Sequence, residues 1–116
     1  MPADENTTVA ELRRLVADFV RLREWEQFHD PKNLAMAIAT EAAELMEHFR
    51  WVPNSASHEL MQDTHARDAA AEELADVLAF LLAFANSCGI DLSDALRAKM
   101  AKNAIKYPAD EYKGRY

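Results

Sequence analysis

Residues Asn33 to Trp51 read NLAMAIATEAAELMEHFRW, a stretch that places two carboxylates, Glu41 and Glu44, on an otherwise apolar helix. An α-helix turns by about 100° per residue, so these two acids lie about 60° apart on one face. Apolar residues border them at three- and four-residue steps: Leu34, Ile38, Ala42, Leu45 and Phe49. We therefore expect a helix whose paired acids converge on one point beside the protein core.

A second stretch, Ala70 to Leu82, repeats this arrangement with Glu73 and Asp76. Carboxylates that face one another repel at neutral pH unless protons or a cation neutralise them. Hard divalent ions prefer oxygen ligands, so the four acids are candidate ligands for Mg²⁺, for which Mn²⁺ is a possible substitute. The alternative is that they are ordinary acids on solvated helix faces, since 20 of the 116 residues are acidic. Two pairs in apolar surroundings favour the metal site.

The composition predicts a single all-α domain. Half of the 116 residues are apolar and only two are glycine, which is typical of a helical chain with few tight turns. We expect one domain over residues 1–116, with an ordered core from about residue 8 to about residue 108. The net charge of −7 argues against nonspecific binding of a nucleic-acid polymer, which depends on clustered lysine and arginine.

Three features concern the compartment in which the protein works. The N-terminal residues MPADENTTVAELRR have neither the basic start nor the apolar centre of a signal peptide. The longest apolar run, Val77 to Ala85, is shorter than the roughly 20 residues that span a membrane. Cys88 is the only cysteine, which excludes an internal disulfide, and we expect it to be a small buried hydrophobic residue. These features predict a soluble, cytoplasmic protein without membrane contact.

Local signals predict four helices. Thr8 and Glu11 have the spacing of a capping box, Gly89 is a typical C-terminal stop, and Asp91 is a typical N-cap. The expected helices run from about Val9 to Arg23, from Pro31 to about Arg50, from between Ala66 and Asp68 to Ser87, and from Leu92 to about Lys106. We expect residues 52–67 to form a loop with one helical turn around His58 to Gln62, and residues 109–116 to form a mobile tail.

The third expected helix also predicts self-association. Beyond Asp76 it is apolar nearly all round, through Val77, Leu78, Phe80, Leu81, Leu82 and Phe84. A helix of this kind is buried on several sides, and one small domain has too little material to cover it. We expect a homo-oligomer, either a homodimer or a dimer of dimers.

Two further groups of residues are candidates for ligand binding. The connection from Trp25 to His29 holds aromatic and polar side chains that can contact a flat ligand, with core packing of Trp25 and a surface role for His29 as alternatives. On the last expected helix, Lys99, Asn103 and Lys106 form one positive edge, for which the alternative is a solvated face near a helix C-terminus. His48 lies one turn beyond Glu44, where solvent exposure is favoured over a contact with the metal ligands.

The acid pairs and their surroundings also resemble a known family. EAAE (41–44), a spacer of 28 residues (45–72) and ELAD (73–76) resemble the E-x-x-E, spacer, E-x-x-D signature of the all-α nucleoside triphosphate pyrophosphohydrolases, the MazG-like superfamily. The resemblance is nearest to the dCTP pyrophosphatase branch and covers roughly Leu12 to Pro108. It is carried by REWEQFH (23–29), NLA (33–35), ELMEHFRW (44–51), EELADV (72–77) and KMAKNAIKYP (99–108).

This resemblance implies a four-helix, MazG-like bundle that hydrolyses a nucleoside triphosphate, of dCTP type, to the monophosphate and pyrophosphate with Mg²⁺. By the same resemblance Glu41 or Glu44 is the general base, and the matching metal ligands are Glu41, Glu44, Glu73 and Asp76. Residues matching the base pocket are Trp25, Gln27, His29 and Trp51, and residues matching the phosphate side are Lys99, Asn103 and Lys106. Two positions depart from the dCTP branch, because Phe80 and Val16 stand where polar pocket residues are expected.

Two other functions stay open from the sequence. A ferritin-like di-metal carboxylate bundle also uses paired acids on helices, but it requires E-x-x-H pairs that this chain lacks. A non-catalytic helical interaction module would carry the four acids as surface charge only. The two differ from the hydrolase in what acid-to-amide substitutions do, because a neutral amide is a poor Mg²⁺ ligand.

Overall fold

The computed structural model describes residues 2–115, which contain helices and no strand. The α-helices are α1 (Val9–Leu22), α2 (Pro31–Glu47), α3 (Asn54–Leu60), α4 (Thr64–Cys88), α5 (Leu92–Lys106) and α6 (Ala109–Tyr112). Two short 3₁₀ helices, η1 (Ala3–Glu5) and η2 (Glu26–Phe28), precede α1 and α2. The prediction of an all-α chain is confirmed, and the four expected helices correspond to α1, α2, α4 and α5.

The helix ends follow from local capping. The Thr8 hydroxyl accepts a hydrogen bond from the Glu11 backbone N–H at 3.1 Å, and the Glu11 carboxylate accepts one from the Thr8 backbone N–H at 2.7 Å. This reciprocal pair is the predicted capping box. Gly89 ends α4 in the left-handed conformation, with φ of 65°, and the Asp91 carboxylate caps α5 by accepting from the Asp94 N–H at 2.9 Å.

Several expectations about irregular segments are wrong. Residues 54–60 form α3, where a loop with one helical turn around His58 to Gln62 was expected. Pro53 is the N-cap with an extended backbone, and the Ser57 hydroxyl donates to the Asn54 carbonyl at 2.8 Å. Helix α2 ends at Glu47, before Arg50, and residues 109–112 form α6 within the expected tail. Cys88 is exposed, because it lies at the end of α4, where the chain turns away.

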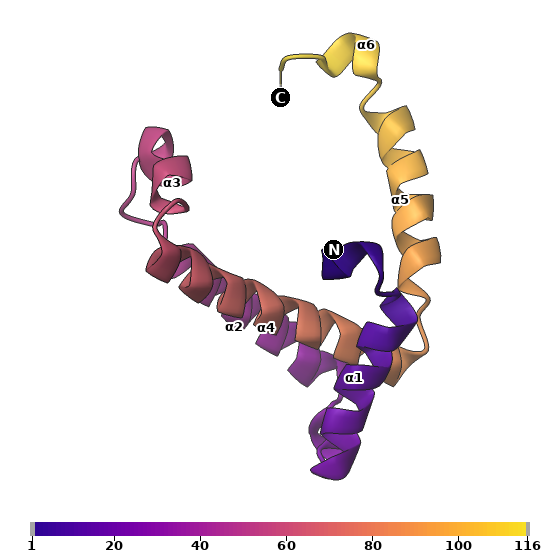
Figure 1. Ribbon diagram of the computed structural model, residues 1–116. Coiled ribbons are helices and arrows are strands. Elements are labelled where there is room, and N and C mark those ends of the chain that lie inside the picture. Colours follow the sequence, from indigo (N-terminus) through magenta and orange to yellow (C-terminus); the bar gives the residue numbers. More distant parts are fainter. Residues whose placement is uncertain (1, 116) are drawn as a thin grey trace.

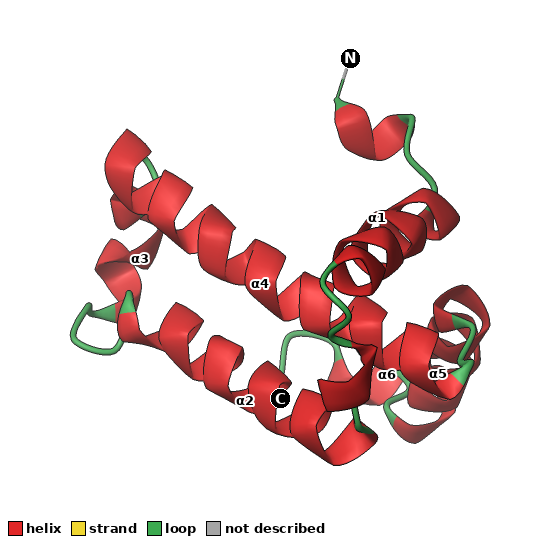
Figure 2. Ribbon diagram, turned by 90° about the horizontal axis from the view of Figure 1, so that it is seen from below, coloured by secondary structure: helices red, strands yellow, loops and turns green. Residues whose placement is uncertain are grey.

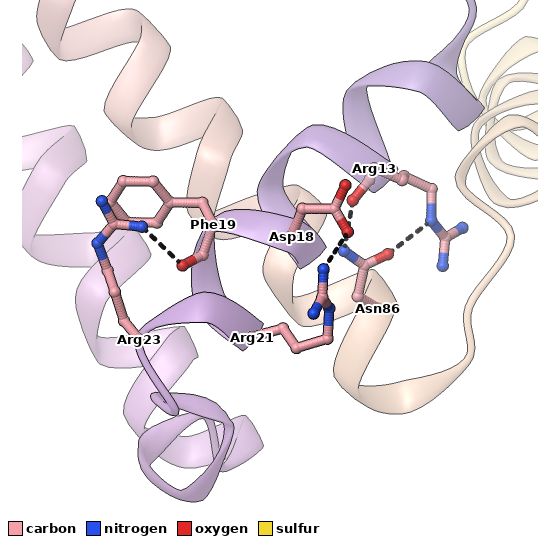
Figure 3. Close-up of polar contacts among 6 residues, drawn as sticks. All are labelled: Arg13, Asp18, Phe19, Arg21, Arg23 and Asn86. Carbon is pink, nitrogen blue, oxygen red and sulfur yellow. Dashed lines mark hydrogen bonds and ion pairs between the residues drawn. The ribbon is translucent and has the colours of Figure 1, made fainter.

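Helices α2 and α4 lie side by side, connected at one end through α3 (Figure 2). The buried residues come mainly from this pair and include Leu34, Ala70, Leu82, Ala83 and Ala85, with Val20 added by α1. Helix α1 crosses the C-terminal half of α4. It is held there by Arg13 and Asn86: the Arg13 Nε donates to Asn86 Oδ1, and Asn86 Nδ2 donates to the Arg13 carbonyl, both at 3.0 Å (Figure 3).

Helix α5 does not pack into this group within one chain. It leaves α4 at an angle of 104° and leads away from the α2–α4 pair (Figure 1). None of its residues is buried, and Leu96, Met100 and Ile105 are 64%, 56% and 81% exposed. The predicted four-helix bundle is therefore not closed by one copy of the chain. In the described range no single helix is long and apolar enough to cross a membrane, and only the bent pair of α4 and α5 taken together meets that requirement.

Candidate functional site

The predicted acids of α2 and α4 come together where the two helices lie side by side. Glu41, Glu73 and Asp76 each bring one carboxylate oxygen to a common point, and these three oxygens lie within 4.8 Å of one another. Glu73 and Asp76 are one turn apart on α4, so they present their carboxylates from the same face toward α2. The acid cluster, defined here as Glu41, Glu44, Glu73 and Asp76, thus combines two helices.

The burial of these acids tests whether the cluster fits a cation. Glu41 and Glu73 are half-buried, while Glu44 and Asp76 are exposed. One oxygen of Glu41 and one of Glu73 are fully buried and have no hydrogen-bond partner. Buried polar atoms without partners are rare because they lose their hydration and gain nothing in return. Two such oxygens in one acidic cluster fit a divalent cation, whose preferred ligands are carboxylate oxygens.

The electrostatics of the cluster include Glu44. Burial raises the pKa of Glu41, with the neighbouring Glu44 as the second cause and Asp76 and Glu73 as further ones. Burial also raises the pKa of Glu73, followed by Glu44 and Asp76, while His48 opposes the rise. His48 Nε2 lies 3.9 Å from Glu73 Oε1, so this histidine faces the cluster where the sequence favoured solvent exposure. A bound cation would relieve the repulsion that raises both pKa values.

An apolar cavity of about 480 Å³ begins at the acid cluster. Asp76 lines one end of it, and Ala79, Phe80 and Ala83 continue the same face of α4. The opposite wall comes from α1 and from Trp25, whose ring meets Phe19 edge-on with centroids 5.9 Å apart. An aromatic ring at the wall of an apolar cavity is suited to a flat, hydrophobic ring system.

A smaller cavity of about 280 Å³, here called the polar cavity, adjoins the apolar one. The two share Val16, Val20, His29 and Ala83 as lining residues. The polar cavity adds Glu26 from η2 and Asn86 and Ser87 from α4. Charged phosphate groups, an apolar ring and a polar ring edge could therefore be accommodated in sequence along one groove, starting from the acid cluster.

Two residues expected at a base pocket lie elsewhere in the single chain. Trp51 is 82% exposed, with the Arg50 guanidinium 4.6 Å from its ring centroid. It follows the end of α2, whereas Trp25 precedes its start, and 17 helical residues span about 25 Å. Gln27 lines neither cavity, and its amide donates to the Glu24 carbonyl at 3.0 Å. Of the four expected pocket residues, Trp25 and His29 line a cavity.

The expected phosphate-side residues are also distant from the acids. Lys99, Asn103 and Lys106 belong to α5, which leads away from α2 and α4 (Figure 1). Lys106 Nζ instead lies 5.3 Å from the Tyr107 ring centroid. Across residues 2–115, no lysine or arginine forms an ion pair with the four acids. One copy of the chain thus holds the acids and the cavities without the positive edge.

Sequence reasoning missed part of the cavity wall. Leu15 and Phe19 line the apolar cavity from α1, and they are 68% and 49% exposed to solvent. The sequence shows that Leu15 and Phe19 lie on one helix face, but this spacing fits a face that packs into the protein core as well as it fits a cavity wall. The edge-on contact between Phe19 and Trp25 distinguishes a cavity wall from a core face. This contact depends on the turn between α1 and η2, which the helical spacing does not determine.

The comparisons with known proteins agree with this geometry. The sequence model of the MazG-like family matches residues 36–115. The chain is 40% identical over 107 residues to dCTP pyrophosphatase 1 of Bos taurus and 42% identical over 102 residues to that of Homo sapiens. These matches cover 92% and 88% of this chain but 63% and 60% of the relatives, so the chain spans about three fifths of their length. A crystal structure of a pyrophosphatase from Archaeoglobus fulgidus DSM 4304 superposes with a TM-score of 0.80 at 37% identity, covering 85% of this chain and 91% of that one.

Proposed function

This chain belongs to the MazG-like family, and from that membership we propose that it hydrolyses a nucleoside triphosphate to the nucleoside monophosphate and pyrophosphate. Water adds across the anhydride bond between the α- and β-phosphates. The observation that carries this proposal is the acid cluster, with its two partnerless buried oxygens, at the mouth of a cavity lined by Trp25. The similarity to dCTP pyrophosphatase 1 supports a substrate of dCTP type.

We propose that Glu41, Glu44, Glu73 and Asp76 together hold Mg²⁺, with Mn²⁺ as a substitute. When bound, the ion would neutralise phosphate oxygens and lower the pKa of a water molecule. By holding the ion at this place, the carboxylates would set where the phosphates lie relative to the cavity, and Glu41 or Glu44 would receive the proton of the attacking water.

The nucleoside would occupy the cavities behind the cluster. Stacking of a base on an aromatic ring is worth about 1 to 3 kcal/mol, and Trp25 offers such a ring at the wall of the apolar cavity. His29 can hydrogen-bond the base because it lines both cavities. Gln27 would have to release the Glu24 carbonyl before its amide could reach a base.

A second copy of the chain is needed to complete the site. Large apolar side chains are exposed along α4 and α5, and a groove of about 260 Å³ is lined by Ile38, Leu81, Phe84, Ala85, Ile90 and Leu92. We propose that two chains cover these surfaces by forming a homodimer, alone or within a dimer of dimers. In this arrangement Lys99, Asn103 and Lys106 from one copy approach the acids of the other, and Trp51 reaches a cavity across the interface.

We propose that residues 1–116 act as one catalytic domain on the nucleotide pool of the cytoplasm. The test is a panel of the common deoxynucleoside triphosphates incubated with the purified chain and Mg²⁺. We expect ³¹P NMR to show equal amounts of nucleoside monophosphate and pyrophosphate, with dCTP among the best substrates. Release of inorganic orthophosphate with a nucleoside diphosphate, or no turnover of any triphosphate, would contradict the proposal.

A further inference from the structure

Arg13 of α1 joins three parts of the chain that are far apart in sequence. Its Nε donates to Asn86 Oδ1 at 3.0 Å, and its Nη1 donates to the Ile90 carbonyl at 2.6 Å. The Asn86 amide donates back to the Arg13 carbonyl at 3.0 Å (Figure 3). Asn86 lies near the end of α4, and Ile90 lies in the connection between α4 and α5. One side chain therefore ties α1 to the end of α4 and to the turn from which α5 starts.

The contacts of Arg13 depend on the shape of its guanidinium. Arg13 is half-buried, and within residues 2–115 it forms no ion pair with a carboxylate. Both of its acceptors are neutral oxygens, one on the Asn86 side chain and one on the Ile90 backbone. A guanidinium can bond both at once because its donors form a rigid, planar fork, which the ammonium group of lysine does not reproduce. The arrangement is therefore suited to fixing a direction.

Helix α5 has little other support within one chain. It leaves α4 at an angle of 104° (Figure 1), and none of its residues is buried. At the turn, the Ile90 N–H donates to the Ala85 carbonyl at 3.0 Å, which is a contact with α4. The Ile90 carbonyl accepts from Arg13, which is a contact with α1. The start of α5 is thus held between α4 and α1 at one residue.

A small rotation at this turn is amplified along α5. At 1.5 Å per residue, Lys99 lies about 10 Å and Lys106 about 21 Å beyond the start of the helix at Leu92. A rotation of about 10° would therefore move these two lysines by about 2 and 4 Å. Misplacing a substrate-binding group by about 1 Å can lower a rate by about 100-fold. The proposed contribution of these lysines thus depends on the direction of α5.

We propose that Arg13 is a positioning residue that fixes the direction of α5 and thereby places Lys99 and Lys106 of one copy against the acid cluster of the other. This inference rests on the proposed function, because the lysines act there on the same substrate. Asn86 lines the polar cavity of its own copy. The tests must therefore separate an effect of Arg13 on α5 from an effect on that cavity.

The first test measures the direction of α5 without turnover. Spin labels are attached at Glu72→Cys of α4 and Lys102→Cys of α5, both exposed positions, in a Cys88→Ser chain, because Cys88 is also exposed. Dilution with unlabelled chain leaves one labelled copy in each oligomer. A rotation of 10° moves Lys102 by about 3 Å. We expect Arg13→Lys to shift or broaden the distance between the labels by at least about this amount, as measured by double electron–electron resonance.

Arg14→Lys is the matched control for this distance. Arg14 is the next residue, carries the same charge, is exposed and makes neither of the two contacts of Arg13. Its substitution should leave the distance as in the chain with both arginines. An unchanged distance in Arg13→Lys would overturn the inference.

The second test asks in which copy Arg13 acts, and it uses mixed dimers of two defective chains. The α5 donor carries Glu44→Gln and Asp76→Asn, and the acid donor carries Lys99→Ala and Lys106→Ala. Their mixed dimer has one complete site, formed by the acids of the acid donor and α5 of the α5 donor. Arg13→Lys in the α5 donor should lower kcat/KM for the best triphosphate by roughly tenfold or more. The same substitution in the acid donor should leave kcat/KM unchanged.

The outcomes distinguish this inference from the proposed function. A loss that follows the acid donor would show that Arg13 acts on its own cavity, and equal losses in both arrangements would show a general effect on folding. Either result overturns the inference and leaves the hydrolase intact. Mixed dimers that are inactive with Arg13 intact would also overturn it, because α5 would then not serve the other copy. If no triphosphate is hydrolysed, the proposed function fails, and the distance between the labels still decides whether Arg13 fixes the direction of α5.

Discussion

Glu41 of α2 and Glu73 of α4 bring carboxylate oxygens to within 4.8 Å of each other, and each keeps a buried oxygen without a hydrogen-bond partner. Like charges at this distance oppose folding unless something neutralises them. The chain therefore gives up stability at this point to hold the two acids together. Such an arrangement is expected where a ligand of opposite charge binds, and it has measurable consequences.

The first prediction concerns pH in the absence of metal. Burial, and then the adjacent Glu44, raises the pKa of both carboxyls above the ordinary value of 4.5. The protonated carboxyls do not repel each other, so the folded chain has its full stability below pH 4.5. This stability is lost as pH rises through the raised pKa values of the folded chain, where the carboxyls ionise. In EDTA, the Tm of Glu41→Gln relative to the wild type should therefore increase from acid to neutral pH. Glu72→Gln is the control, and a difference that does not change with pH would contradict the assignment.

The second prediction concerns metal binding. A ligand that binds the folded chain alone stabilises it by about 2.7 kcal/mol at a hundred times its Kd. We expect Mg²⁺ and Mn²⁺ to raise the Tm of the wild type at pH 7.5, and to do so much less in Glu73→Gln, because the amide is a poor ligand. Glu72→Gln should respond as the wild type does. Equal shifts in all three proteins would place the ion elsewhere.

The third prediction concerns Trp25. If its ring binds the base equally in the ground and transition states, Trp25→Ala loses stacking worth about 1 to 3 kcal/mol, which raises KM by roughly fivefold to 150-fold with little change in kcat. Phe28→Ala provides a control, because Phe28 is also an exposed aromatic residue of this connection but lines neither cavity. A Trp25→Ala enzyme with unchanged KM would show that the ring is structural.

The fourth prediction concerns the second copy. Ile105 is 81% exposed on α5, and a charge at this position should disrupt an apolar interface. We expect Ile105→Glu to sediment as a monomer and to lose activity while keeping its helical circular dichroism. A monomeric and fully active variant would refute the shared site.

Mixed oligomers test the same point more specifically. Glu44→Gln with Asp76→Asn removes acids from one chain, and Lys99→Ala with Lys106→Ala removes the positive edge from another. Each pure protein should be inactive, and co-expressed chains should regain activity, because one of the two sites in a mixed dimer is complete. If mixed dimers are shown to form and are inactive, the proposal that α5 of one copy contributes to the site of the other is contradicted.

The features that the sequence predicted well are those determined by local chemistry. Thr8 and Glu11 cap a helix wherever they occur at this spacing, and Gly89 and Asp91 act over a few residues only. The convergence of Glu41 with Glu73 and Asp76 followed from the three-residue spacing of each pair once two helices lie side by side. The start of α3, residues 54–57, was mistaken for loop because proline, asparagine and serine occur both in loops and at helix starts.

The features that could not be predicted depend on the path of the chain between helices. The direction of α5 is determined by the short connection after Cys88, and nothing in the periodicity of Lys99, Asn103 and Lys106 specifies it. The separation of Trp25 from Trp51 could have been recognised, because the expected helix between them is about 30 Å long at 1.5 Å per residue. A base pocket that contains both Trp25 and Trp51 of the same chain was therefore excluded by length alone.

The most direct test of the central claim is pyrophosphate release from dCTP by Glu44→Gln with Asp76→Asn, measured with saturating Mg²⁺ beside the wild type and Glu72→Gln. The four acids are proposed to bind the ion on which turnover depends. The double variant should therefore fold normally and lose more than roughly a hundredfold in rate, beyond the loss typical of an outer metal contact. Glu72→Gln should match the wild type. A folded double variant that releases pyrophosphate at the wild-type rate would contradict the account.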